Sequence, residues 1–172
     1  MNAQLLGWVT GAYFVAFVAV VYFTRATARR VAGAIAGGVV AAAILLGVMV
    51  LAEKFEWWHV FLAPTPSSLA LLYICGAISC APIYLLTWRV ARRFGSNGLM
   101  VFIFVATIIG PPRDYLVAAV YPEWIAFGAG IFPILAVAAT YGCLVAFGHA
   151  AMSIVAGPSK GDGLARSNDV AA

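Results

Sequence analysis

Two short segments of this chain hold most of the side chains that could do chemistry. In the first, Glu53, Glu56 and His59 recur every three residues, so a helix through them would place all three on roughly one face. Glu56 and His59 form an E-x-x-H pair, the spacing at which a helix offers a carboxylate and an imidazole to one metal ion. Di-iron bundles use two such pairs, whereas this chain has one, and Pro64 and Pro66 follow soon after it. The sequence therefore predicts no metal site here.

The second segment reads Gly-Pro-Pro-Arg-Asp-Tyr over residues 110–115 and places Arg113 beside Asp114. A guanidinium group binds phosphate or carboxylate head groups, and a neighbouring carboxylate such as Asp114 or Glu123 can orient it. Proline has no backbone N–H, so we expect a helix to stop at the Pro-Pro pair, with Arg113 at the membrane interface. The alternative is one helix over Leu99–Val120. It would put the Arg–Asp pair inside the bilayer, at a cost of ~2.5–3.5 kcal/mol unless the arginine is paired.

Membrane-spanning helices must position these groups. Of the 172 residues, 65% are hydrophobic and 9% are charged, whereas about a quarter of a soluble domain is charged. The charges separate five uncharged runs, each of about 19 residues or more, and roughly 20 apolar residues span a bilayer core. We predict an all-α, polytopic membrane protein with five transmembrane helices near residues 5–23, 31–52, 69–88, 94–112 and 124–155. They form one domain over 1–156, followed by a disordered cytoplasmic tail over 157–172.

The basic residues predict the orientation of these spans. Eight of them fall in two arginine-rich loops and the tail, at positions 25, 29, 30, 89, 92, 93, 160 and 166. Only Lys54 and Arg113 fall on the other side. Because basic residues favour the cytoplasmic side, we expect the N-terminus outside and the C-terminus inside. Residues 1–23 lack the basic start and cleavage site of a signal peptide, so we expect a first span and a multi-pass protein of a bacterial inner membrane.

Prolines, glycines and cysteines give further expectations. Pro82 and Pro133 are expected to bend the third and fifth spans. Gly33 and Gly37 form a G-x-x-x-G pattern, which lets another helix of the same chain or of a second copy approach closely. The three cysteines lie in predicted spans without a C-x-x-C motif, which argues against thiol redox chemistry. His149 is predicted near the inner leaflet and is interpreted as a packed, hydrogen-bonded residue.

On this topology, the polar and aromatic residues of the outer side form a candidate site. The candidate acid–base residues are Glu53, Glu56, Asp114 and Glu123. The candidate ligand-binding residues are Arg113, His59, Trp57, Trp58, Trp124 and Tyr115. An aromatic belt with ordinary loop residues is the simpler explanation of the same group.

Three functions are compatible with these features. A non-catalytic accessory or structural component of a membrane assembly ranks first, because the chain is small and its helices are rich in glycine and alanine. A membrane-embedded enzyme acting on a lipid or isoprenoid-like substrate at the outer face ranks second. A transporter, or a binding subunit for a small amphipathic molecule, ranks third. We expect contacts with membrane lipids and with a second copy or another membrane protein, and no cofactor, metal or nucleic acid.

Overall fold

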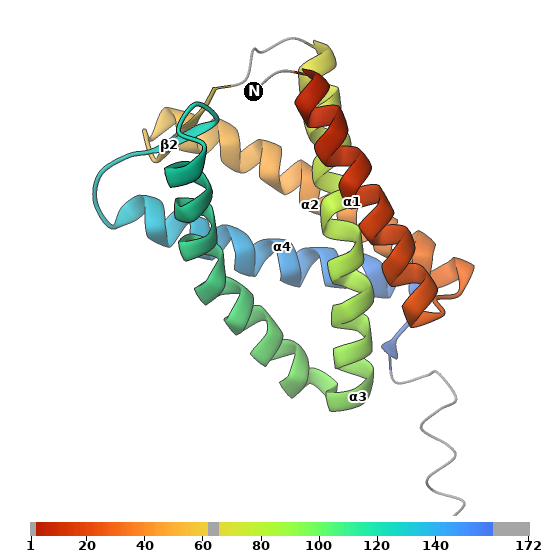
Figure 1. Cartoon of the computed structure of the whole chain (residues 1–172). Coiled ribbons are helices and arrows are strands. Elements are labelled where there is room, and N and C mark those ends of the chain that lie inside the picture. Colours follow the sequence, from red (N-terminus) through yellow and green to blue (C-terminus); the bar gives the residue numbers. More distant parts are fainter. Residues whose placement is uncertain (1–2, 62–65, 160–172) are drawn as a thin grey trace, which may run out of the picture.

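Long helices make up almost all of the computed structural model, which describes residues 3–61 and 66–159 (Figure 1). The helices are α1 (Ala3–Thr24), α2 (Ala28–Lys54), α3 (Pro66–Val120) and α4 (Phe132–Ala156), and the strands are β1 (Trp58–Val60) and β2 (Ile125–Phe127). The strands pair in antiparallel fashion, with His59 opposite Ala126. In the described ranges, four helices are long and apolar enough to cross a membrane. The all-helical fold class is confirmed, and these helices indicate a membrane protein in general terms.

A single residue, Gly95, divides α3 into two arms. Its backbone angles are φ 67° and ψ −158°, which are not helical, and its positive φ favours glycine over other residues. We call residues 66–94 α3a and residues 96–120 α3b, and in Figure 1 the two arms meet at a sharp angle. The arginine-rich loop predicted between the third and fourth spans is therefore wrong. Its arginines belong to the end of α3a, because one glycine reverses the chain without a longer loop.

The predicted helix stop at Pro111-Pro112 is also wrong. Helix α3b runs through both prolines to Val120, as in the alternative of one helix over Leu99–Val120. Packing against α4 accounts for this, since Pro111 is buried and Gly110 lies directly against the ring of Tyr141. Prolines are tolerated in apolar helices where neighbouring groups support the interrupted ladder. Pro82 likewise lies inside α3a without ending it.

The start predicted for the fifth span is a turn and a strand instead. Trp124 precedes β2, and α4 begins only at Phe132. Pro133 lies in the first turn of α4, where its missing N–H breaks no helical hydrogen bond. The proline therefore begins a helix and does not bend one. The tail predicted over 157–172 lies outside the described residues from position 160 onward, and Gly157 ends α4 with a φ of 88°.

Small residues bring α2 close to both α3 and α4. A methyl group added at Gly37 would lie 2.6 Å from the carbonyl oxygen of Gly148 in α4. One added at Gly33 would lie 2.9 Å from the Ala156 side chain, also in α4. Gly38 faces the other way, against the backbone of Ala77 in α3a. The G-x-x-x-G pattern is therefore used inside this chain.

Three polar residues lie in the interface between α3a and α4. The Tyr84 side chain is 1% exposed, and its hydroxyl donates to the Leu144 carbonyl oxygen over 2.9 Å. The Thr87 hydroxyl lies 3.0 Å from the Tyr84 carbonyl oxygen and 2.9 Å from Nδ1 of His149. We call Tyr84, Thr87 and His149 the inner cluster. His149 is thus packed and hydrogen-bonded, which agrees with the interpretation from the sequence.

Candidate functional site

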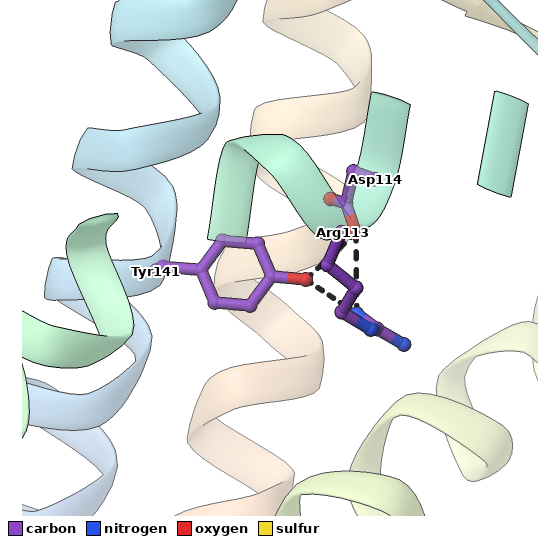
Figure 2. A network of polar contacts seen from close by, with 3 residues as sticks. All are labelled: Arg113, Asp114 and Tyr141. Carbon is purple, nitrogen blue, oxygen red and sulfur yellow. Dashed lines mark hydrogen bonds and ion pairs between the residues drawn. The ribbon is translucent and has the colours of Figure 1, made fainter. Parts of the chain in front are cut away.

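A second polar cluster joins α3b to α4, and it contains two of the predicted site residues. Tyr141 of α4 donates its hydroxyl hydrogen to Oδ1 of Asp114 over 2.8 Å, and Nη1 of Arg113 lies 3.2 Å from the same oxygen. Nη1 of Arg113 also donates to the Tyr141 oxygen. Each of the three side chains is bonded to the other two (Figure 2). We call Arg113, Asp114 and Tyr141 the arginine cluster.

The arginine of this cluster is held on one side only. Its side chain is 55% exposed, whereas that of Asp114 is 28% exposed. All its hydrogen bonds to the described residues are made by Nη1, which leaves Nε and Nη2 without one. Figure 2 shows the far end of the guanidinium turned away from the Tyr141 ring. Because a guanidinium carries five N–H donors in a fixed plane, the open edge can still bind a planar anion through two parallel hydrogen bonds.

Two other helices lie near this guanidinium. Tyr13 of α1 and Cys80 of α3a are both within electrostatic range of Arg113. Tyr13 is partly exposed and Cys80 is buried. The surroundings of Arg113 therefore include α1 and α3a as well as α4.

The two-stranded sheet lies next to the arginine cluster. Tyr115 stacks on Phe127 of β2, with ring centroids 4.2 Å apart and planes inclined by 12°. The Trp58 ring of β1 lies 5.9 Å from the same phenylalanine. Tyr141 packs against the small apolar core formed by Ala52, Trp58 and Val137. The sheet thus brings two predicted binding residues, Trp58 and Tyr115, to the aromatic group beside the cluster.

The first candidate segment does not form the helical face expected from its spacing. Helix α2 ends at Lys54, Glu56 has a φ of 55°, and His59 belongs to β1. Pairing of β1 with the distant strand β2 gives this segment an extended form. The three-residue spacing therefore does not place the three side chains on one face of a helix. His59 still reaches Glu53, with Nδ1 2.6 Å from Oε1 and 2.7 Å from Oε2, and both side chains are exposed.

The remaining predicted residues lie apart from these contacts. Trp57 stacks on Phe55 with ring centroids 5.1 Å apart, and Trp124 stacks on Tyr121 at 4.2 Å. Glu56 and Glu123 are exposed, and their carboxylates make no hydrogen bond or ion pair with the described residues. Within the described ranges, no group of three or more His, Cys, Asp or Glu side chains is placed to hold a metal ion.

The residue that sequence reasoning missed is Tyr141. It lies in an uncharged run, where an aromatic side chain is read as part of an apolar span. Its hydroxyl could have indicated a polar neighbour, because a buried phenol usually has a hydrogen-bond partner. The partner itself, on a helix 27 positions earlier in the chain, follows only from the fold.

Comparison of the chain with protein-family models, with curated proteins and with solved structures gave no match in any of the three.

Proposed function

We propose that this chain is a non-catalytic component of a membrane assembly that binds the acidic head group of an amphipathic membrane molecule at Arg113. The observation that carries the proposal is the half-exposed guanidinium, oriented through Nη1 by Asp114 and Tyr141 and open along its other edge. An arginine positioned in this way loses little further entropy when it binds a carboxylate or phosphate group.

The proposal includes five spans, with the N-terminus outside and the C-terminus inside. The break at Gly95 supports it, because α3a and α3b would each be about 35 Å long or more, against a hydrocarbon core of about 30 Å. Contacts among the basic residues support a common cytoplasmic end. The Arg30 guanidinium of α2 and that of Arg92 in α3a both lie over the Trp88 ring, 4.3 and 5.6 Å from its centre. The same positive-inside argument supports a bacterial inner membrane.

In this topology Arg113 would lie at membrane depth. It precedes the end of α3b at Val120 by seven residues, or about 10 Å along the helix, and the residues between are apolar or aromatic apart from Asp114. An unpaired arginine costs ~2.5–3.5 kcal/mol at the centre of a membrane helix and less toward its ends, and charged residues inside the membrane are functional candidates for that reason. Asp114 and Tyr141 satisfy one edge, and an anionic ligand would satisfy the other.

The positions of the carboxylates favour binding over catalysis. Asp114 is committed to Arg113 and Tyr141, and Glu53 is committed to the exposed His59. Glu56 and Glu123 lie in turns and are exposed. General acid–base chemistry needs a carboxyl group that can exchange a proton with a bound substrate. Asp114 is the candidate beside the open edge of Arg113, and its Oδ1 already accepts hydrogen bonds from Arg113 and Tyr141.

Helix α1 supports membership of an assembly. It packs chiefly against α3, and several of its large apolar side chains, including Trp8, Phe14 and Tyr22, are exposed. Purification in a mild detergent tests this part of the proposal. We expect a second copy or another membrane protein to remain bound, and a strictly monomeric protein with no partner would contradict it.

Equilibrium binding of radiolabelled dodecanoate to the purified full-length protein, in a non-ionic detergent, tests the head-group site. We expect Arg113→Gln to weaken binding at least tenfold and Arg113→Lys to weaken it less, because lysine keeps the charge but loses the planar pair of donors. Arg93→Gln is the matched control, since Arg93 is an exposed arginine at the end of α3a, before the break at Gly95. Equal binding by Arg113→Gln and wild type would overturn the proposal.

A further inference from the structure

An apolar groove of about 570 Å³ lies in the angle between the two arms of α3, well away from the arginine cluster. Its lining residues are Val90 and Phe94 of α3a and Asn97, Gly98, Val101, Phe102 and Val105 of α3b. The volume falls within the range of roughly 300–1,000 Å³ that is typical of small-molecule sites. In Figure 1 this angle closes at the bend and widens toward the sheet.

A continuous exposed stripe connects the groove to Arg113. Val101, Val105, Ile109 and Arg113 follow one another at intervals of four residues, so they succeed each other along one side of α3b. All four side chains are exposed. The stripe is about 18 Å long from Val101 to Arg113 at the rise of an α-helix. It is apolar along its whole length except at the arginine.

The opposite side of α3b is occupied by the protein itself. Gly110 lies directly against the Tyr141 ring of α4, and Asp114 is bonded to the hydroxyl of the same tyrosine. The stripe is therefore part of the side of α3b that α4 leaves exposed, and it meets α4 at Arg113. Arg113 lies at one end of the stripe and the apolar groove at the other. This arrangement matches a molecule with one charged head and one apolar tail.

We propose that this stripe binds one single-chain, long-chain carboxylate, with its head on the open edge of Arg113 and its tail running past Ile109 into the groove at the bend of α3. The inference rests on the proposed head-group site and adds the class of ligand and its direction. A single chain is favoured because the stripe offers one cation and one row of apolar side chains.

The charge of the cluster selects the head group. Asp114 already accepts a hydrogen bond from Nη1 of Arg113 over 3.2 Å, so its carboxylate stands beside any anion bound to the same guanidinium. A second negative charge on the ligand would be repelled by Asp114, since like charges at a few ångström interact by several kcal/mol where water is scarce. A singly charged carboxylate fits this site better than a doubly charged phosphate monoester.

Photolabelling tests the direction of the tail. The full-length protein in lipid nanodiscs is labelled with palmitate that carries a diazirine on its terminal carbon, and the labelled peptides are mapped by mass spectrometry. We expect label within residues 90–105, competed by unlabelled palmitate and not by its methyl ester. Label spread evenly over the exposed faces of α1, α2 and α4, or competition by a phospholipid alone, would overturn the proposal.

Two variants separate this inference from the proposed function. Val105→Trp fills the stripe, and we expect it to weaken palmitate binding at least tenfold relative to octanoate, whose shorter tail would not reach Val105. Phe104→Trp is the matched control, because Phe104 is exposed on α3b but is not a residue of the stripe. If Arg113→Gln abolishes binding while Val105→Trp and Phe104→Trp behave alike, the tail proposal fails and the head-group site stands. If Arg113→Gln has no effect, both fail.

Discussion

The inner cluster and the arginine cluster both join α3 to α4, but they differ in whether their polar groups all have hydrogen-bond partners. In the inner cluster, Tyr84 and Thr87 are almost fully buried and their hydroxyls bond to neighbours within the fold. In the arginine cluster, Asp114 and Tyr141 are satisfied, whereas Arg113 keeps one edge open and half of its surface exposed. A buried network with all partners present stabilises one packing of the helices. A network that orients a guanidinium but leaves some of its N–H donors unbonded can still bind an anion.

Truncation of the two tyrosines separates these roles most strongly. Tyr84→Ala removes a buried ring that lies against Gly37 and Gly148, and we expect it to lower the free energy of unfolding by about 3–5 kcal/mol. Tyr141→Ala removes a more exposed ring, so we expect a smaller loss of stability and a larger loss of dodecanoate binding. Unfolding followed by circular dichroism in mixed micelles measures the first effect. Equal destabilisation with unchanged binding for both variants would remove the distinction between the clusters.

Asp114→Asn sharpens the comparison at the arginine cluster alone. Asparagine keeps a hydrogen-bond acceptor near Nη1 of Arg113 but removes the negative charge that limits which anions can bind. We expect dodecyl phosphate to gain about tenfold in affinity relative to dodecanoate, which corresponds to about 1.4 kcal/mol. Competition against radiolabelled dodecanoate gives this ratio directly. An unchanged ratio would show that the neighbouring carboxylate does not select the head group.

Sequence reasoning succeeded where local composition decides the outcome. The uncharged runs predicted helices that the structure contains. The choice of Arg113 and Asp114 as site residues came from the rarity of charges in such a chain, and it stays a prediction. It failed where distant contacts decide. Helix α3b continues through Pro111 because α4 packs against the neighbouring Gly110. His59 joins a strand because residues 125–127 pair with its segment. Neither contact can be recognised from the residues next to it in the sequence.

Tyr141 and Gly95 illustrate two different limits. Tyr141 has no charged neighbour in sequence, so its role appears only when α4 lies against α3b. Gly95 stands in a Gly-Ser-Asn-Gly run that is typical of a loop, and the structure uses only the first glycine as the break. In the first case the partner was missing from the local sequence. In the second, the break was predicted but its length was not, because one positive φ is sufficient to reverse direction.

The contact between His59 and Glu53 gives the smallest expected effect. The pair is exposed, and unlike the arginine cluster it holds no guanidinium with an unbonded edge. Both side chains are more than half exposed, and exposed ion pairs are worth about 0–1 kcal/mol. We expect His59→Gln to change the free energy of unfolding by less than about 1 kcal/mol and to leave dodecanoate binding unaltered. A loss of binding as large as that of Arg113→Gln would mean that the two sequence segments act together. The ligand site would then extend from the arginine cluster across the sheet to the end of α2, and the comparison would have to include all three polar groups.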